Sequence, residues 1–160
     1  MTGREGSGWR VAIGSDPAGA GHLAALTADL RTSPLVGQVI EPGRGRTPAY
    51  PDAALAAAEL VAAGRADRAL LVCHTGLGMC VAANKVLGIR AVTAHDAYSV
   101  DHAIRYTNAQ VLCLGQAIVP LALACELVQL WLNLRFDPRS KAAHKLALIA
   151  AYERDHRPPA

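Results

Sequence analysis

Short apolar runs alternate with longer helical patterns along most of the chain, and this order constrains the fold more than any other feature. The run Arg68–Cys73 (RALLVC) is apolar after its first residue, which is typical of a strand that is buried on both faces. Strands that alternate with helices pair in parallel through right-handed crossovers. We therefore predict an α/β protein with a three-layer, doubly wound (Rossmann-like) open sheet of about five parallel strands.

The expected elements follow the hydrophobic periodicity and its breakers. The expected strands are residues 10–14, 36–40, 68–73, 89–93 and 111–114, and the expected helices are residues 18–31, 51–63, 79–86, 97–107, 120–134 and 139–153. A loop is expected over residues 41–50, where Gly and Pro recur. We predict one domain over residues 9–155, with flexible termini at residues 1–8 and 156–160.

Composition and charge exclude several classes of protein. Four Cys in 160 residues are too few for a disulfide scaffold, and 18% charged residues are too few for a disordered chain. The net charge of +3 is small and its Lys and Arg are scattered, so no nucleic-acid partner is expected. Residues 1–10 lack the apolar core of a signal peptide, and the apolar stretch 117–134 is interrupted by Pro, Glu, Gln and Asn. We therefore expect no membrane segment, and reduced thiols in a cytoplasmic protein.

The chemistry is expected where strands end, because ligands of an open parallel sheet bind outside the carboxyl ends of its strands. Cys73 ends one strand and is followed by the Gly-rich segment His74–Met79. Main-chain N–H groups and a helix terminus at such a turn favour a thiolate and can hold a developing oxyanion. A base beside an oxyanion hole serves proton abstraction next to a carbonyl. A buried structural cysteine above a tight turn is the alternative interpretation.

Two further strand ends carry polar residues. Asp16, after the first expected strand, either binds substrate hydroxyls or caps the next helix, and capping is the commoner use of such an aspartate. His95 and Asp96 follow the fourth expected strand, where a hydrogen-bonding role and a structural one are both open. The other histidines have no metal-ligand spacing with Cys or Asp, so no metal site is expected.

Several segments together resemble the ribose-5-phosphate isomerase B family, which includes the galactose-6-phosphate isomerase subunits. The matching segments, in the order of the family over residues 10–136, are Gly14-Ser15-Asp16, Tyr50-Pro51-Asp52, Cys73 with Thr75-Gly76-Leu77-Gly78, Ala82–Val86, Gly88–Ala91, His95–Ser99 and Val111–Gly115. Cys80 in Gly78–Val81 and Asn108-Ala109-Gln110 resemble the erythrulose-4-phosphate isomerase branch of this family.

The resemblance implies an aldose–ketose isomerase of a phosphorylated sugar that uses neither metal nor cofactor. It further implies a homodimer or a dimer of dimers, with active sites between subunits. Cys73 matches the thiolate base that moves a proton between C1 and C2 through a cis-enediolate, and Thr75 matches the loop residue that steadies it. The expected substrate-binding residues are Ser15, Asp16, Gly76, Gly78, Met79, His95, Tyr106 and Asn108.

Departures from the family pattern bear on the substrate. The histidine that opens a furanose ring in the family is Tyr106 here, and the arginine expected after the fifth strand is absent. A tetrulose 4-phosphate has its 4-hydroxyl esterified, so it cannot close to a five-membered ring and needs no ring-opening residue. We therefore expect conversion of D-erythrulose 4-phosphate to D-erythrose 4-phosphate, while ring opening by Tyr106 would keep ribose 5-phosphate as the alternative.

The phosphate group is expected to bind basic residues, namely Arg139, Lys145 and Arg44. Arg139 is preferred because a guanidinium fork suits phosphate and because the family takes this segment from the neighbouring subunit. A non-catalytic partner subunit or sugar-phosphate sensor is an alternative of another class, against which the retained Cys73 argues. Redox sensing by Cys73 is a further possibility, but the spacing of the cysteines identifies no resolving thiol.

Overall fold

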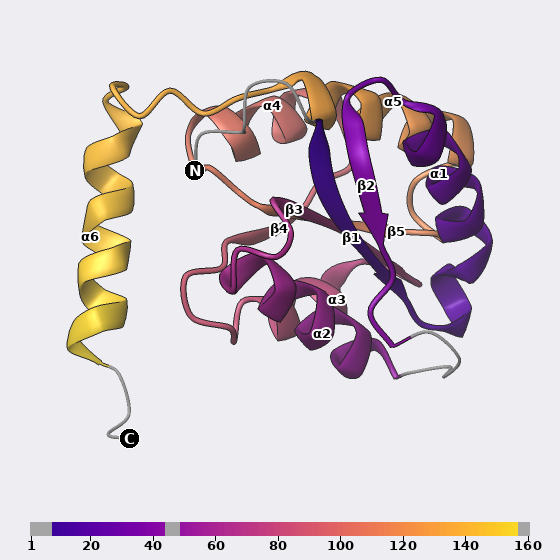
Figure 1. Ribbon diagram of the computed structural model, residues 1–160, viewed down its shortest axis with the longest axis horizontal. Helices are drawn as coiled ribbons and strands as arrows, with labels where there is room; N and C mark the ends of the chain where they lie inside the picture. The colour runs from indigo at the N-terminus through magenta and orange to yellow at the C-terminus, as the bar shows by residue number, and fades with distance from the viewer. Residues whose placement is uncertain (1–7, 44–48, 157–160) are drawn as a thin grey trace.

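The computed structural model describes residues 8–43 and 49–156, in which strands alternate with helices as predicted (Figure 1). The strands are β1 (Trp9–Ser15), β2 (Val36–Ile40), β3 (Arg68–Cys73), β4 (Ala91–Thr93) and β5 (Val111–Gly115). The helices are the 3-10 turn η1 (Pro17–Gly19), α1 (Ala20–Thr32), α2 (Tyr50–Ala62), α3 (Leu77–Ala83), α4 (Ala97–Arg105), α5 (Leu121–Asn133) and α6 (Ala142–Asp155). Within the described ranges no helix combines the length and apolar character that crossing a bilayer requires.

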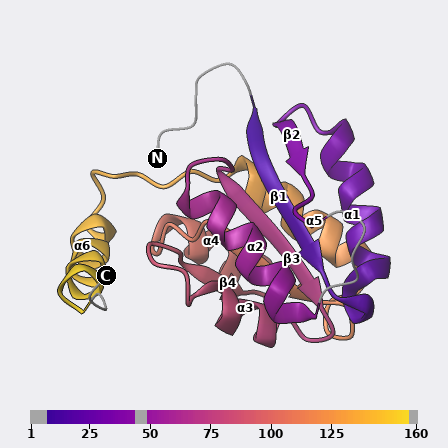
Figure 2. The ribbon, with the colours of Figure 1, turned by 60° about the horizontal axis from the view of Figure 1, so that its bottom comes forward.

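The strands form one parallel sheet in the order β2-β1-β3-β5-β4. Helices α1, α4 and α5 cover one face, and α2 and α3 cover the other (Figure 1 and Figure 2). β3 lies at the centre, and all of its residues are buried. The chain changes direction across the sheet between β1 and β3, and such a switch point is where doubly wound sheets bind ligands. The predicted three-layer sheet is thereby confirmed.

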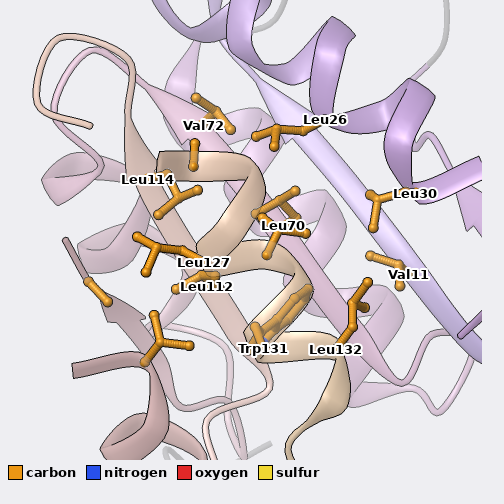
Figure 3. Close-up of a cluster of buried hydrophobic side chains, with 14 of the residues drawn as sticks. Val11, Leu26, Leu30, Leu70, Val72, Leu112, Leu114, Leu127, Trp131 and Leu132 are labelled. Carbon is orange, nitrogen blue, oxygen red and sulfur yellow. The ribbon is translucent and has the colours of Figure 1, made fainter. Parts of the chain in front are cut away.

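Alternate residues of each strand enter one of two apolar layers, as the period of a strand requires. Leu70 and Val72 face α1 and α5, in one cluster with Leu26 and Trp131 (Figure 3). Leu71 and Cys73 face α2 and α3 instead. The inner positions of α2 are mostly Ala, so this helix can approach the sheet closely. This alternation places the thiol of Cys73 in the α2/α3 layer.

Arg68, the first residue of β3, fixes α5 to the edge of the sheet where the strands begin. Its side chain lies 4.0 Å from the centre of the Trp9 ring and 5.1 Å from that of Trp131. It donates hydrogen bonds to the carbonyls of Trp131 and, at 2.7 Å, of Leu134, at the carboxyl end of α5. Burial lowers the pKa of Arg68 to about 9, so the side chain is protonated at neutral pH and its charge complements the helix end.

Some elements end at other residues than expected, for local reasons. β4 is shorter than the expected strand 89–93. At residues 90 and 91 the main-chain N–H groups donate to side chains and not to a neighbouring strand. Asn84 accepts the N–H of Ala91 at 2.8 Å, and Gln110 accepts that of Arg90 at 2.9 Å. α4 ends before residue 107 because Asn108 adopts a left-handed conformation, with φ of 46°.

Helix α6 stands apart from the other helices in Figure 1 and Figure 2. It begins at residue 142 rather than 139, after a turn closed by the N–H of Ser140 on the carbonyl of Asp137 at 3.0 Å. Glu153 near its end accepts the N–H of Gly88 at 3.2 Å. Large apolar side chains remain exposed on it, namely Leu148, Ile149 and Tyr152. Residues 1–7 and 157–160, which were expected to be flexible, lie outside the described part of the chain.

Candidate active site

The loops that follow β3 and β5 are joined at the carboxyl edge of the sheet. The N–H of Gln116 donates to the carbonyl of Cys73 at 2.8 Å, and the N–H of Ala117 donates to that of His74 at 3.0 Å. The contact is so close that a Cβ on Gly115 would lie 2.6 Å from the carbonyl oxygen of Thr75. These two loops therefore form one rigid floor.

The turn after β1 lies against the same floor. A Cβ on Gly19, at the end of η1, would lie 2.8 Å from the amide nitrogen of Cys73. Gln116 extends the connection, because its Oε1 accepts the N–H of His22 at 2.9 Å near the start of α1. The ends of β1, β3 and β5 thus meet around Cys73, as their order in the sheet requires.

The thiol of Cys73 is directed at the glycine turn. Its Sγ accepts the N–H of Gly76 at 3.1 Å, and the residue is 5% exposed in the single chain. Gly76 has a φ of 81°, which aims its N–H back toward the strand. The following helix α3 has only seven residues, so the single N–H of Gly76 holds the sulfur, rather than a long helix dipole. A main-chain donor aimed at sulfur is the contact that a thiolate accepts.

The rest of the turn is held from both sides. The hydroxyl of Thr75 accepts the N–H of Leu77 at 3.4 Å, and the hydroxyl of Thr93 on β4 donates to the carbonyl of Gly76 at 3.3 Å. Gly78 lies under the ring of Tyr50, whose Cε2 would be 2.8 Å from a Cβ at that position. Thr75, Gly76 and Gly78 therefore lie together beside Cys73, as expected from the sequence.

Met79 and Ser15, which we expected to bind substrate, point elsewhere. Met79 is fully buried in the layer between α2, α3 and the sheet. Ser15 lines a cavity of about 330 Å³ on the opposite face, with Leu23 and Thr27 of α1 and with Arg31 and Glu41 at its rim. Arg31 and Glu41 form an ion pair.

The two expected aspartates both cap helices. Asp16 accepts the N–H of Gly19 through Oδ1 at 3.1 Å, and Asp96 accepts both the N–H and the hydroxyl of Ser99 at 2.8 Å. The hydrogen bonds from Ser99 lower the pKa of Asp96. Among the described residues Oδ2 of Asp16 has no hydrogen-bond partner, so capping leaves one oxygen for a ligand. His95 is exposed after β4, at the same edge as Cys73.

Tyr106 and Asn108 lie at the opposite edge of the sheet from Cys73. They follow α4 and precede β5, whose other end, Gly115, pairs with Cys73. The carbonyl of Asn108 accepts Nη2 of Arg90 at 3.1 Å. Tyr106 is 55% exposed. One chain therefore does not bring these two residues to its own thiol.

The expected phosphate-binding residues also lie away from Cys73. Arg139 is in the segment before α6, where it contacts Asp137 at 3.5 Å and its side chain is 91% exposed. Lys145 is exposed on α6. Arg44 lies outside the described residues. Within the described part of one chain, neither Arg139 nor Lys145 lies with the thiol, the glycine turn and Asp16.

Two residues of the site were not predicted as such from the sequence. Tyr50 begins α2 and covers Gly78, and Gln116 joins the ends of β3 and α1. An aromatic residue directly before the Pro that starts a helix was a usable signal for Tyr50. For Gln116 the only sequence signal was its position directly after a strand.

The fold and site define a class: a Rossmann-like α/β protein with a thiol and main-chain donors at the switch point of its sheet. Residues 11–149 match the family described as Ribose/Galactose Isomerase. The chain belongs to this family, as predicted.

Individual relatives agree with this assignment. The chain is 53% identical over 147 residues to D-erythrulose-4-phosphate isomerase 2 of Mycolicibacterium smegmatis, covering 90% of this chain and 97% of that protein. It is 38% identical over 144 residues to D-erythrulose-4-phosphate isomerase of Pectobacterium atrosepticum, covering 89% and 94%. The structure of ribose-5-phosphate isomerase B from Clostridium thermocellum superposes with a TM-score of 0.85 at 33% identity, covering 92% and 99%. The predicted class, an isomerase of sugar phosphates, is confirmed.

Proposed function

We propose that this chain interconverts D-erythrulose 4-phosphate and D-erythrose 4-phosphate, with Cys73 as the base. The observation that carries the proposal is the 3.1 Å hydrogen bond from the Gly76 N–H to Sγ of Cys73, at the meeting point of three strand ends. The relatives from Mycolicibacterium smegmatis and Pectobacterium atrosepticum, both named for erythrulose 4-phosphate, support the four-carbon substrate.

The reaction is a proton transfer between neighbouring carbons. The Cys73 thiolate removes a proton from C1 of the ketose, and the electron pair of that C–H bond forms the C1–C2 double bond of a cis-enediolate. The negative charge moves to the oxygen on C2, where main-chain N–H groups of the glycine turn stabilise it. The thiol then returns the proton to C2. The proton of the C1 hydroxyl passes to the oxygen on C2, so that C1 becomes the aldehyde and C2 carries the hydroxyl.

The four-carbon substrate follows from ring chemistry. In a tetrose 4-phosphate the 4-hydroxyl carries the phosphate, so a five-membered ring cannot close and no group is needed to open it. Tyr106 stands where the resemblance places a ring-opening histidine. A phenol is a much weaker acid–base group than imidazole at neutral pH, because its pKa lies near 10.

Ribose 5-phosphate is the second candidate, and one observation favours it. The ring of Tyr106 stacks on His102 with centroids 4.6 Å apart, so an imidazole lies beside the phenol after all. The chain is also 39% identical over 88 residues to ribose-5-phosphate isomerase B of Escherichia coli, covering 55% of this chain and 59% of that protein.

The working unit in this proposal is a homodimer or dimer of dimers in the cytoplasm. Two features support a shared site: Tyr106 and Asn108 lie at the edge away from Cys73, and α6 exposes apolar side chains beyond Arg139. A second copy would supply these residues, with Arg139 as the phosphate ligand. The four free cysteines and the phosphorylated substrate support a reducing compartment.

The test is the ratio of kcat/KM for the two aldoses, erythrose 4-phosphate and ribose 5-phosphate, measured with the chain purified alone. We expect erythrose 4-phosphate to be preferred by at least about 100-fold, since ribose 5-phosphate closes to a furanose that must be opened before its proton can be removed. A preference for ribose 5-phosphate would transfer the assignment to the second candidate. Absence of turnover with both would indicate a partner subunit or sensor.

A further inference from the structure

A second thiol, Cys80, lies on α3 one layer above Cys113 of β5. Cys113 is fully buried in the α2/α3 layer, and Cys80 is half-buried and packs against the same apolar cluster. In its protonated form the Sγ of Cys80 donates to the carbonyl of Ala91, 3.3 Å away. Ala91 and Thr93 of β4 pair with Val111 and Cys113 of β5, so this contact places the Cys80 sulfur over the strand pair that contains Cys113.

The polar surroundings of Cys80 stabilise negative charge on its sulfur. The amide nitrogen Nδ2 of Asn84 lies 3.6 Å from Sγ and is oriented as a donor. Hydrogen bonding to the thiol of Cys113, and then to Thr93 and Asn84, outweighs the effect of burial and lowers the pKa of Cys80 to about 6. The hydrogen bond to Cys80, followed by burial and the negative charge on Cys80, raises the pKa of Cys113 well above its usual value. Half-burial leaves Cys80 open to a small oxidant, whereas Cys113 is closed to it.

We propose that Cys80 and Cys113 form a peroxide-sensitive dithiol pair that closes to a disulfide between α3 and β5. The Cys80 thiolate attacks one oxygen of hydrogen peroxide, the O–O bond breaks, and hydroxide leaves, so that sulfur becomes a sulfenic acid. The sulfur of Cys113 then attacks the Cys80 sulfur. The S–O bond breaks, the S–S bond forms, and the departing hydroxide takes the Cys113 proton to give water. The two sulfurs lose two electrons and the peroxide gains them.

Cys73 is not the partner of Cys113 in this reaction. β3 and β5 pair Leu71 with Cys113 and Cys73 with Gly115, so the two cysteines are diagonal neighbours on one face of the sheet. Diagonal neighbours on paired strands have Cβ atoms about 7 Å apart, whereas a disulfide needs about 4 Å. The sulfur of Cys73 is in addition held by the N–H of Gly76.

The bond would connect α3 to the sheet directly behind the turn that holds Cys73. α3 begins at Leu77, next to Gly76, and Cys80 lies one helical turn further on. Oxidation of this pair requires neither substrate nor turnover, so it can be measured independently of the isomerase reaction.

The test treats the purified chain with hydrogen peroxide, blocks free thiols, and maps chymotryptic peptides without reduction. Cleavage after Leu77 or Met79 separates Cys73 from Cys80, and cleavage after Leu114 separates Cys113 from Cys125. We expect a Cys80–Cys113 peptide pair that dithiothreitol removes, and complete loss of that pair in Cys80→Ser. The matched controls Cys73→Ser and Cys125→Ser should retain it.

The peptide map of the wild-type chain is sufficient to decide the outcome, so the test does not depend on whether any variant folds. A disulfide from Cys73 to Cys113, or Cys80 oxidised to a sulfinic acid with Cys113 still free, would overturn the proposal. So would the absence of any oxidation at Cys80 under conditions that oxidise the half-buried Cys125.

Discussion

At the scale of single residues, the chemistry depends on what surrounds each sulfur. Cys73, Cys80 and Cys113 line the same layer of the molecule, yet they meet different groups. The sulfur of Cys73 meets the N–H of a left-handed glycine, that of Cys80 meets side-chain donors, and Cys113 is enclosed by the core. Only Cys73 also lies where the ends of β1, β3 and β5 converge, which makes it the candidate base.

Replacing this sulfur tests the assignment directly. In Cys73→Ala the base is absent, so we expect kcat for erythrulose 4-phosphate to fall by at least about 10³-fold. The strand should remain folded, because Ala fits a buried position, and circular dichroism with thermal unfolding checks this. Cys125→Ala on α5 is the matched control and should keep wild-type turnover. Near-normal kcat in folded Cys73→Ala would remove this thiol from the mechanism.

At the scale of elements, the turn between β3 and α3 is fixed by one glycine. Gly76 combines a φ of 81° with close neighbours, since a Cβ there would lie 3.0 Å from the carbonyl carbon of Leu114 and 3.1 Å from Cγ2 of Thr93. Gly88 has the same φ but no neighbour within 4 Å of a Cβ. A comparison of alanine variants at Gly76 and Gly88 therefore separates the destabilisation caused by a left-handed backbone from that caused by a crowded Cβ.

We expect Gly88→Ala to lower the free energy of unfolding by about 1 kcal/mol, because only the left-handed backbone is penalised. Gly76→Ala should lower it by about 2–4 kcal/mol, since crowding against β5 is added to the same strain. Gly76→Ala should also reduce kcat, because the turn moves its N–H away from Cys73. Urea unfolding and steady-state kinetics measure both effects. Equal losses in the two variants, with unchanged kcat in each, would contradict this account of the turn.

The elements also explain how far the sequence could predict the site. A buried apolar strand, a cysteine at its end and a glycine turn are neighbours along the chain, so Cys73, Thr75 and Gly76 could be grouped by local pattern. The contact between Cys80 and Cys113 could not, because it depends on β5 lying beside β3 and on α3 folding back over β4 and β5. The spacing of the cysteines along the chain identifies no resolving thiol, whereas the packing of α3 on β4 and β5 places Cys80 and Cys113 in one layer.

Tyr106 and Asn108 are the opposite case, because the sequence pattern groups them with the site and the fold separates them from it. Their sequence pattern associates them with the site, and the sheet places them at its opposite edge. A local sequence pattern does not show whether a loop contributes to the site of its own chain or to that of a neighbouring copy. The predicted role of these residues therefore depends on assembly, which is a property of the whole molecule.

At the scale of the whole molecule, the proposed active site is divided between two copies of the chain. In this proposal one copy supplies Cys73 and the glycine turn, and the other would supply Arg139 from the exposed segment that leads to α6. Cys73→Ala and Arg139→Ala should each be nearly inactive alone, the first for want of a base and the second for want of a phosphate ligand. A hybrid dimer of the two variants nevertheless has one site with both residues intact.

Refolding the two variants together in equal amounts should therefore restore about a quarter of wild-type turnover, because half of the dimers are hybrids and each has one complete site of two. The matched control mixes Cys73→Ala with the double variant Cys73→Ala/Arg139→Ala, in which no dimer has a complete site, and it should stay inactive. Turnover at low concentrations of erythrulose 4-phosphate is the measurement, with size-exclusion chromatography to verify the dimer. If the mixture of single variants remains as inactive as its components while hybrids are present, both residues act within one chain and the shared site is wrong.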